Sequence, residues 1–228
     1  KMNLTKILNE GTTIYTSGST GPCKAINQPV EKIKAANNIA RDVQSISKRS
    51  KIYTVCKLNH AGGLFAQTLP AYEINAEILI EDFNAFRWVK IIEKFSHSHL
   101  TPGMANAVTM TKSWKNLDLK GKTITCGSDR VDNIFINKFL EKDCIFIVNW
   151  GMSEVGPIAI NQIFTKSDYP IEDFGEYSLM GNKSYVDTKI INDELYVKGD
   201  ICVYDDWFPT GDIVKKVNKT FWYVGRKK

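Results

Sequence analysis

The order of the apolar segments constrains the fold of this chain more than any other feature of its sequence. Up to about residue 165, short apolar runs alternate with stretches of helical periodicity. The runs with the length of strands are 52–55, 77–80, 123–126 and 144–148. Apolar residues recur at helical spacing over 28–47, 85–95, 102–111 and 131–141. Because strands joined by helices form parallel or mixed sheets with helices on both faces, this part is predicted to be an α/β core.

After residue 165 the pattern changes to an alternation of apolar and polar residues, which is typical of half-buried antiparallel strands. These strands are expected at 185–191, 194–198, 213–217 and 220–224. The complete prediction is an α/β protein. Residues 1–165 form a mixed or parallel sheet layered with helices, and residues 166–228 form a small antiparallel β-rich lobe.

The composition is typical of a globular protein with a hydrophobic core. Hydrophobic residues make up 43% of the chain and aromatic residues 11%, which is enough for a sizeable core. The net charge of +5 is modest, and the basic runs 48–51 and 226–228 hold no aromatic residues for base stacking. No signal peptide and no apolar run near the ~18 residues of a membrane span is present. We therefore expect a cytoplasmic protein with reduced cysteines and with no nucleic-acid or membrane partner.

A candidate phosphate-binding loop follows the β-branched run 12–14. Residues 15–24 read Tyr-Thr-Ser-Gly-Ser-Thr-Gly-Pro-Cys-Lys. Gly18 and Gly21 allow the backbone to approach a ligand closely, and the exposed amides form an anion-binding nest with the charge of Lys24 beside it. The hydroxyl donors are Thr16, Ser17, Ser19 and Thr20. The pattern differs from the Walker A loop, whose lysine directly follows a glycine, and an ordinary Ser/Gly turn remains the alternative.

Three later segments also stand at the ends of predicted strands. Residues 150–154, Trp-Gly-Met-Ser-Glu, follow the run 144–148, and open α/β sheets bind ligands at the carboxyl ends of their strands. Glu154 suits Mg²⁺, which usually takes one or two carboxylates plus substrate phosphates. Asp212 can accept hydrogen bonds from ribose hydroxyls, and Gly225-Arg226 closes the series. Each segment alone is an ordinary turn, but their order indicates a nucleotide site.

In this combination the chain resembles the adenylate-forming (AMP-binding) superfamily, which contains acyl- and aryl-CoA ligases, luciferases and the adenylation domains of peptide synthetases. The resemblance runs from about Tyr15 to Lys228. It is carried by the phosphate loop and by the segments 150–154, 194–199, 207–212 and 225–226. In the loop Cys23 and Ala25 replace the usual proline and glycine. With only 14 residues before Tyr15 and none after Lys228, the resemblance implies a truncated member without the C-terminal domain and its adenylation lysine.

The resemblance implies ATP-dependent activation of a carboxylic acid to an acyl-adenylate, with release of pyrophosphate. Mg²⁺ is the implied cofactor, and coenzyme A or a carrier-protein thiol is a further acceptor. Residues 151–157 favour an aryl or medium-length acyl acid. One alternative is a non-catalytic ATP- or AMP-binding module. Another is a fragment or subunit that acts as a homo-oligomer or with a separate C-terminal-domain partner.

The resemblance also assigns site residues. The catalytic residues are Lys24, Ser153 and Glu154, with Glu154 as the metal ligand. The nucleotide-binding residues are Thr16, Ser17, Gly18, Ser19, Thr20, Gly21, Lys24, Gly127, Ser128, Trp150, Gly151, Met152, Ser153, Asp212 and Arg226. The residues that the resemblance assigns to the pocket for the acid are His60 and Gly156. The alternative for each is a turn, capping or core role.

Two further histidines lie two residues apart in the strand-like segment 96–100. His97 and His99 therefore share a face, which is compatible with a metal pair. Because no third ligand is near in the sequence, we expect surface residues instead.

Overall fold

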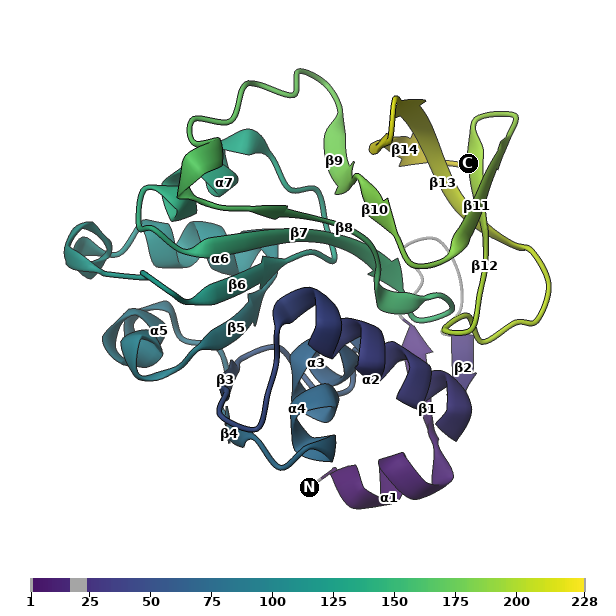
Figure 1. Ribbon diagram of the computed structural model, residues 1–228, viewed down its shortest axis with the longest axis horizontal. Coiled ribbons are helices and arrows are strands. Elements are labelled where there is room, and N and C mark those ends of the chain that lie inside the picture. Colours follow the sequence, from purple (N-terminus) through teal and green to yellow (C-terminus); the bar gives the residue numbers. More distant parts are fainter. Residues whose placement is uncertain (1, 17–23, 228) are drawn as a thin grey trace.

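The computed structural model describes residues 2–16 and 24–227, and the central element of the fold is a seven-stranded sheet (Figure 1). Its strands are β3 (Lys51–Thr54), β4 (Glu77–Ile80), β5 (His97–Leu100), β6 (Thr123–Cys126), β7 (Ile145–Met152), β8 (Gly156–Phe164) and β10 (Lys183–Ser184). They lie in the order β10-β8-β7-β6-β5-β3-β4. The strands from β4 to β7 are parallel, whereas β8 and β10 run antiparallel to their neighbours. The predicted α/β class with a mixed sheet is confirmed.

Helices cover both faces of this sheet. One face carries α2 (Val30–Gln44), α3 (Ala61–Gly63), the π-helix η1 (Leu64–Thr68) and α4 (Leu69–Glu73), with α1 (Leu4–Glu10) packed on α2. The other face carries α5 (Ala85–Ile91), α6 (Pro102–Thr109), α7 (Asn133–Leu140) and the 3₁₀ turns η2 (Ile92–Lys94) and η3 (Lys112–Asn116). Successive strand side chains alternate between the two helix layers, as Phe146 packs beside α7 and Ile147 beside α2. This double cover explains why the strands are apolar almost throughout.

A second sheet of five antiparallel strands forms the C-terminal lobe. Its strands are β9 (Ser178–Gly181), β11 (Asp187–Ile191), β12 (Glu194–Lys198), β13 (Phe208–Val217) and β14 (Thr220–Arg226), in the order β11-β12-β13-β14-β9. A short 3₁₀ turn, η4 (Lys166–Asp168), precedes β9. The predicted antiparallel lobe is thus confirmed, although β10 returns from it to the edge of the seven-stranded sheet.

A separate hairpin of β1 (Thr12–Thr16) and β2 (Lys24–Gln28) holds the ends of the candidate phosphate loop together. The side-chain amide of Gln28 donates to the carbonyl of Ser153 at 2.7 Å. This hydrogen bond attaches the hairpin to the turn that carries Ser153 and Glu154, two segments that are 125 residues apart in the sequence.

The helix predicted over 28–47 is shorter in the structure, because both of its ends are fixed by local backbone geometry. Gln28 belongs to β2, and α2 starts after Pro29. At the other end Ser45 has a left-handed φ of 54°, and the amide of Ile46 donates to the carbonyl of Arg41, which ends the helix.

The expectation that His97 and His99 lie on the surface is wrong. Their exposed fractions are 5% and 4%, because β5 is a central strand with helices on both faces. Within residues 2–16 and 24–227, no group of three or more His, Cys, Asp or Glu side chains is arranged to hold a metal ion.

The cysteines of the described segments are buried free thiols, which agrees with the expectation that they are reduced. They are Cys56, Cys126, Cys144 and Cys202. Burial raises the pKa of Cys56 to about 12 and that of Cys202 to about 11, so both thiols are protonated at neutral pH.

Among the helices that the structure describes, none combines the length and the apolar character needed to cross a bilayer.

Candidate functional site

A pocket of about 220 Å³ lies between the carboxyl ends of β6 and β7 and the five-stranded sheet. Its walls are formed by Ser128, Asp129, Arg130, Asn149, Trp150, Gly151, Ser178, Leu179, Met180, Asp212, Tyr223 and Arg226. Five of these residues were predicted to bind nucleotide: Ser128, Trp150, Gly151, Asp212 and Arg226. The fold therefore brings together segments that are separated by up to about one hundred residues in the sequence.

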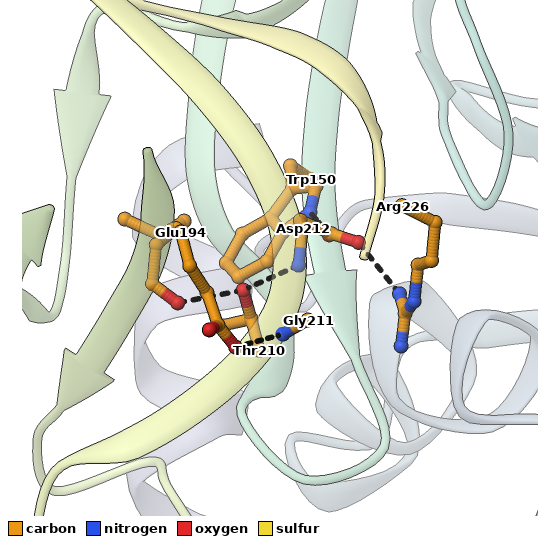
Figure 2. A network of polar contacts seen from close by, with 7 residues as sticks. Trp150, Glu194, Thr210, Gly211, Asp212 and Arg226 are labelled. Carbon is orange, nitrogen blue, oxygen red and sulfur yellow. Dashed lines mark hydrogen bonds and ion pairs between the residues drawn. The ribbon is translucent and has the colours of Figure 1, made fainter. Parts of the chain in front are cut away.

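Asp212 is the central polar residue of this pocket (Figure 2). The indole Nε1 of Trp150 donates to its Oδ2 at 2.8 Å, and Nη1 of Arg226 donates to its Oδ1 at 2.6 Å. Only 4% of Asp212 is exposed. Burial raises the pKa of Asp212, while the Trp150 and Arg226 donors act in the opposite direction by favouring the carboxylate. Because a carboxylate has about four lone-pair sites, both oxygens keep acceptor capacity for a ligand.

A break in the strand register presents Asp212 to the pocket. Glu194 of β12 pairs with Ile213, whereas Tyr196 pairs with Pro209, so three residues of β13 oppose a single residue of β12. Within this bulge the Thr210 hydroxyl donates to the carbonyl of Leu195 at 2.8 Å and accepts from the amide of Asp212 at 3.1 Å. These two hydrogen bonds stabilise the bulge, and Figure 2 shows how Thr210 and Asp212 lie within it.

Glu194 secures the same bulge from the other side. Its carboxylate accepts from the amide of Gly211 at 3.1 Å and from Nζ of Lys227 at 2.6 Å. The hydrogen bond from Lys227 lowers the pKa of Glu194, which is buried and ionised at neutral pH. Successive basic residues at the end of β14, Arg226 and Lys227, are thus each paired with a buried acid.

At two positions at the edge of the pocket, a neighbouring backbone segment approaches so closely that only glycine fits. A Cβ atom on Gly127 would lie 2.5 Å from the carbonyl oxygen of Asn149. A Cβ atom on Gly151 would overlap the carbonyl of Gly156 across the β7–β8 hairpin. The predicted glycines therefore shape the site through packing, and any direct contact with a nucleotide stays a prediction.

The remaining predicted residues of the 150–156 segment lie beside the pocket. Met152, Ser153 and Gly156 line a smaller recess together with Gln28. Gly156 has a φ of +96° and packs against Ile201. Glu154 is 9% exposed, and no described basic side chain forms an ion pair with it. Its assignment as a metal ligand stays a prediction.

The phosphate loop is described only at its ends. Thr16 and Lys24 face each other in the hairpin, where the Thr16 hydroxyl donates to the carbonyl of Lys24 at 3.4 Å. The predicted residues Ser17, Gly18, Ser19, Thr20 and Gly21 lie outside the described residues.

His60, which was predicted to line the acid pocket, is exposed at the N-terminus of α3, and the described pocket does not include it.

Sequence reasoning missed several residues of the pocket wall. The Arg130 guanidinium lies 5.1 Å from the ring centroid of Tyr223, and its Nη2 donates to the carbonyl of Val224 at 3.1 Å. Asn149 donates through Nδ2 to the carbonyl of Pro157 at 2.6 Å, whereas its buried Oδ1 has no partner among the described residues. The only signal for these two residues was their position in the sequence, since Asn149 directly precedes the segment 150–154 and Arg130 lies two residues after Ser128.

Comparison with known proteins gives one family and many similar folds. The family model described as AMP-binding enzyme matches residues 12–208. No curated protein matches the sequence significantly. Among solved structures, the inhibitor-bound N-terminal domain of FACL13 from Mycobacterium tuberculosis is 16% identical with a TM-score of 0.78, and the match covers 95% of this chain and 60% of that one.

Two further structures agree with this match. McyG A-PCP complexed with phenylalanyl-adenylate is 16% identical with a TM-score of 0.81, and the match covers 95% of this chain and 47% of that one. ATP-bound MatB from Rhodopseudomonas palustris is 14% identical with a TM-score of 0.75, and the match covers 95% of this chain and 48% of that one. The chain thus spans about half of the length of these structures, and at such identities the likeness concerns the fold.

Proposed function

This chain belongs to the AMP-binding enzyme family, and from that membership we propose that it activates a carboxylic acid as its acyl-adenylate at the expense of ATP. The observation that carries the proposal is the buried carboxylate of Asp212, which Trp150 and Arg226 hold at the wall of a pocket. A preorganised acceptor of this kind suits the paired hydroxyls of a ribose.

The polar groups of the pocket fit a nucleotide. Asp212 keeps acceptor sites for ribose hydroxyls, and the unpartnered Oδ1 of Asn149 can accept from the exocyclic amine of adenine. A buried acceptor without a partner is costly, so a ligand that donates to it gains more than one that does not. The Tyr223 ring beside Arg130 adds a flat surface for a base.

In the proposed reaction a carboxylate oxygen of the acid attacks the α-phosphorus of ATP. A bond forms between them, the bond to the β-phosphate oxygen breaks, and pyrophosphate leaves with the bonding electrons. No protein nucleophile is required, so the protein contributes positioning and charge neutralisation. Lys24 and the loop that precedes it would contact the phosphates. Glu154 would hold Mg²⁺, which neutralises phosphate charge when bound, and its single carboxylate suits an ion that keeps most of its ligands from ATP and water.

The first experiment separates nucleotide binding from catalysis. We expect calorimetry to detect AMP binding by the unmodified protein, and Asp212→Ala to weaken it about tenfold through lost hydrogen bonds to the ribose. Absence of AMP binding by the unmodified protein would contradict the proposed site.

The second experiment tests catalysis. With a panel of aryl and medium-length acids, we expect acid-dependent release of pyrophosphate, and Lys24→Ala should lower its rate by about 10²–10³ because a charge contact to the phosphates is lost. Lys219→Ala, a change at an exposed lysine in the β13–β14 turn, is the matched control and should leave the rate unchanged. AMP binding without turnover of any acid would favour a non-catalytic nucleotide-binding module.

A further inference from the structure

The side chain of His99 is buried at the ligand-binding edge of the seven-stranded sheet. It lies near the carboxyl end of β5, whose neighbours in the sheet are β6 and β3, and only 4% of it is exposed. It shares its face of the sheet with His97, whose ring contacts the C-terminal end of α2. His99 therefore points into the layer between the sheet and the helices α2 and α3.

His97 and His99 differ in their hydrogen bonds, although they have the same residue type, strand and face. The ring of His97 is bonded at both nitrogens, to the Ser96 hydroxyl at 2.7 Å and to the carbonyl of Gln44 at 2.8 Å. Neither nitrogen of His99 has a partner within the described residues. Buried polar groups are normally paired, so each exception requires an explanation.

His99 is uncharged at neutral pH. Burial lowers its pKa to about 4, so the ring carries one N–H donor and one lone-pair acceptor. Leaving both unpaired destabilises the folded protein. A ligand that bonds to the ring removes this cost.

The contacts around Gly62 connect His99 to the wall of the pocket. A Cβ atom on Gly62 would lie 3.1 Å from the Ser128 hydroxyl oxygen and 3.3 Å from Nε2 of His99. Ser128 is exposed, has a left-handed φ of 77° and lines the pocket. Gly62 thus lies between the Ser128 hydroxyl at the pocket wall and the His99 ring, and any side chain at this position would press on both.

We propose that His99 is a specificity-determining residue that selects a carboxylic acid with an uncharged hydroxyl group on its organic part. The hydroxyl enters beside Gly62 and Ser128 and hydrogen-bonds to the His99 ring. A hydroxyl both donates and accepts, so it suits either tautomer of the ring, whereas a charged group would lose its hydration at so buried a position. This inference rests on the proposed function, because it concerns the acid that the same site activates.

The first test compares the two histidines by thermal unfolding. His97→Leu breaks one buried and one partly buried hydrogen bond and should lower the melting temperature by about 4 °C or more. His99→Leu breaks none and removes two unpaired polar atoms, so we expect the melting temperature to stay the same or to rise. An equal loss of stability in the two variants would show that His99 is a structural residue and would overturn the proposal.

The second test measures kcat/KM for pyrophosphate release with matched acids: benzoate against 4-hydroxybenzoate and 3-hydroxybenzoate, and hexanoate against 6-hydroxyhexanoate. We expect a hydroxylated acid to be preferred about tenfold or more, because a site that bonds a hydroxyl is left unpaired by an acid that lacks it. His99→Leu should abolish the preference by slowing the hydroxylated acid. His99→Gln keeps a donor and an acceptor and should restore part of it.

The outcomes separate this inference from the proposed function. Turnover without a preference for the hydroxylated acids, or a preference that persists in His99→Leu, would overturn the role of His99 alone. Absence of turnover with every acid would contradict both proposals. Gly62→Ala adds a methyl group between Ser128 and His99, and it should reduce turnover of the hydroxylated acids most.

Discussion

At the scale of single residues, the orientation of Asp212 depends on partners that the local sequence does not reveal. Trp150 is 62 residues away in the chain and lies in the other sheet. The sequence motifs predicted that both residues belong to the site, but the hydrogen bond between them follows from the packing of the two sheets. Trp150 thus positions the carboxylate in addition to forming the pocket wall.

Trp150→Phe should weaken AMP binding about threefold to tenfold, because the ring is kept while the N–H donor to Asp212 is lost. Calorimetry with 2′,3′-dideoxy-AMP is the discriminating measurement, since a ligand without ribose hydroxyls should be insensitive to the substitution. An equal loss for both ligands would mean that Trp150 acts only as a packing surface. Trp207→Phe, a change outside the pocket, is the control.

Glu194 should make a pH-dependent contribution to stability. Its pKa is lowered in the folded protein by the hydrogen bond from Lys227, from an ordinary value of about 4.3. Such a carboxyl stabilises the fold above its unfolded pKa, and the contribution is lost as the pH falls through the folded pKa. Glu194→Gln should therefore lower the melting temperature at pH 7, and the difference should shrink as the pH falls below about 4. A difference that is constant from pH 7 to pH 3 would contradict this account.

At the scale of secondary-structure elements, the close approach of β6 and β7 leaves no room for a side chain at Gly127. Gly127→Ala should destabilise the fold by about 1–3 kcal/mol, because its Cβ would meet the Asn149 backbone, and it should weaken AMP binding. Gly103→Ala is the matched control, since its Cβ lies no nearer than 3.9 Å to its neighbours and alanine favours the helix α6. Chemical denaturation measures both changes, and equal effects would exclude the steric explanation.

The sequence predicted regular elements better than irregular ones. Periodicity located β3, β4, β6, β7 and the lobe strands β11 to β14 but not β9, because strands with one or two buried faces have recognisable patterns. The helical segment 61–73 and the strand β8 were not predicted. The bulge at 210–212 could not be predicted either, since it is defined by the pairing of β12 with β13 and not by local residues. The motif nevertheless indicated that Asp212 is a site residue.

At the scale of the whole molecule, the two sheets share a chain path and a core. The chain passes from β8 to β9 in the lobe, returns as β10 to the seven-stranded sheet and leaves again as β11. Ala159 and Ile160 of β8 pack in one cluster with Leu195 and Val197 of β12. We therefore propose that residues 1–165 and 166–228 unfold as one unit.

Leu195→Ala tests this coupling. Leu195 is fully buried, so its truncation should cost about 2–5 kcal/mol. The α-helices of the described chain lie within residues 4–140, far from the substitution in sequence. Circular dichroism of the helices should nevertheless lose its signal at a temperature several degrees lower than in the unmodified protein. If the helical circular dichroism signal keeps the melting temperature of the unmodified protein, the lobe unfolds independently of the α/β part.

The contact between Trp150 and Asp212 also gives the pocket an optical reporter. The emission of an indole responds to charges beside it, and this indole is hydrogen-bonded to a carboxylate that is paired with Arg226. A nucleotide that engages the carboxylate changes the electric field at the ring. Occupancy of the pocket can then be followed through intrinsic fluorescence without a labelled ligand, and Trp150→Phe gives the emission of the other tryptophans as the reference.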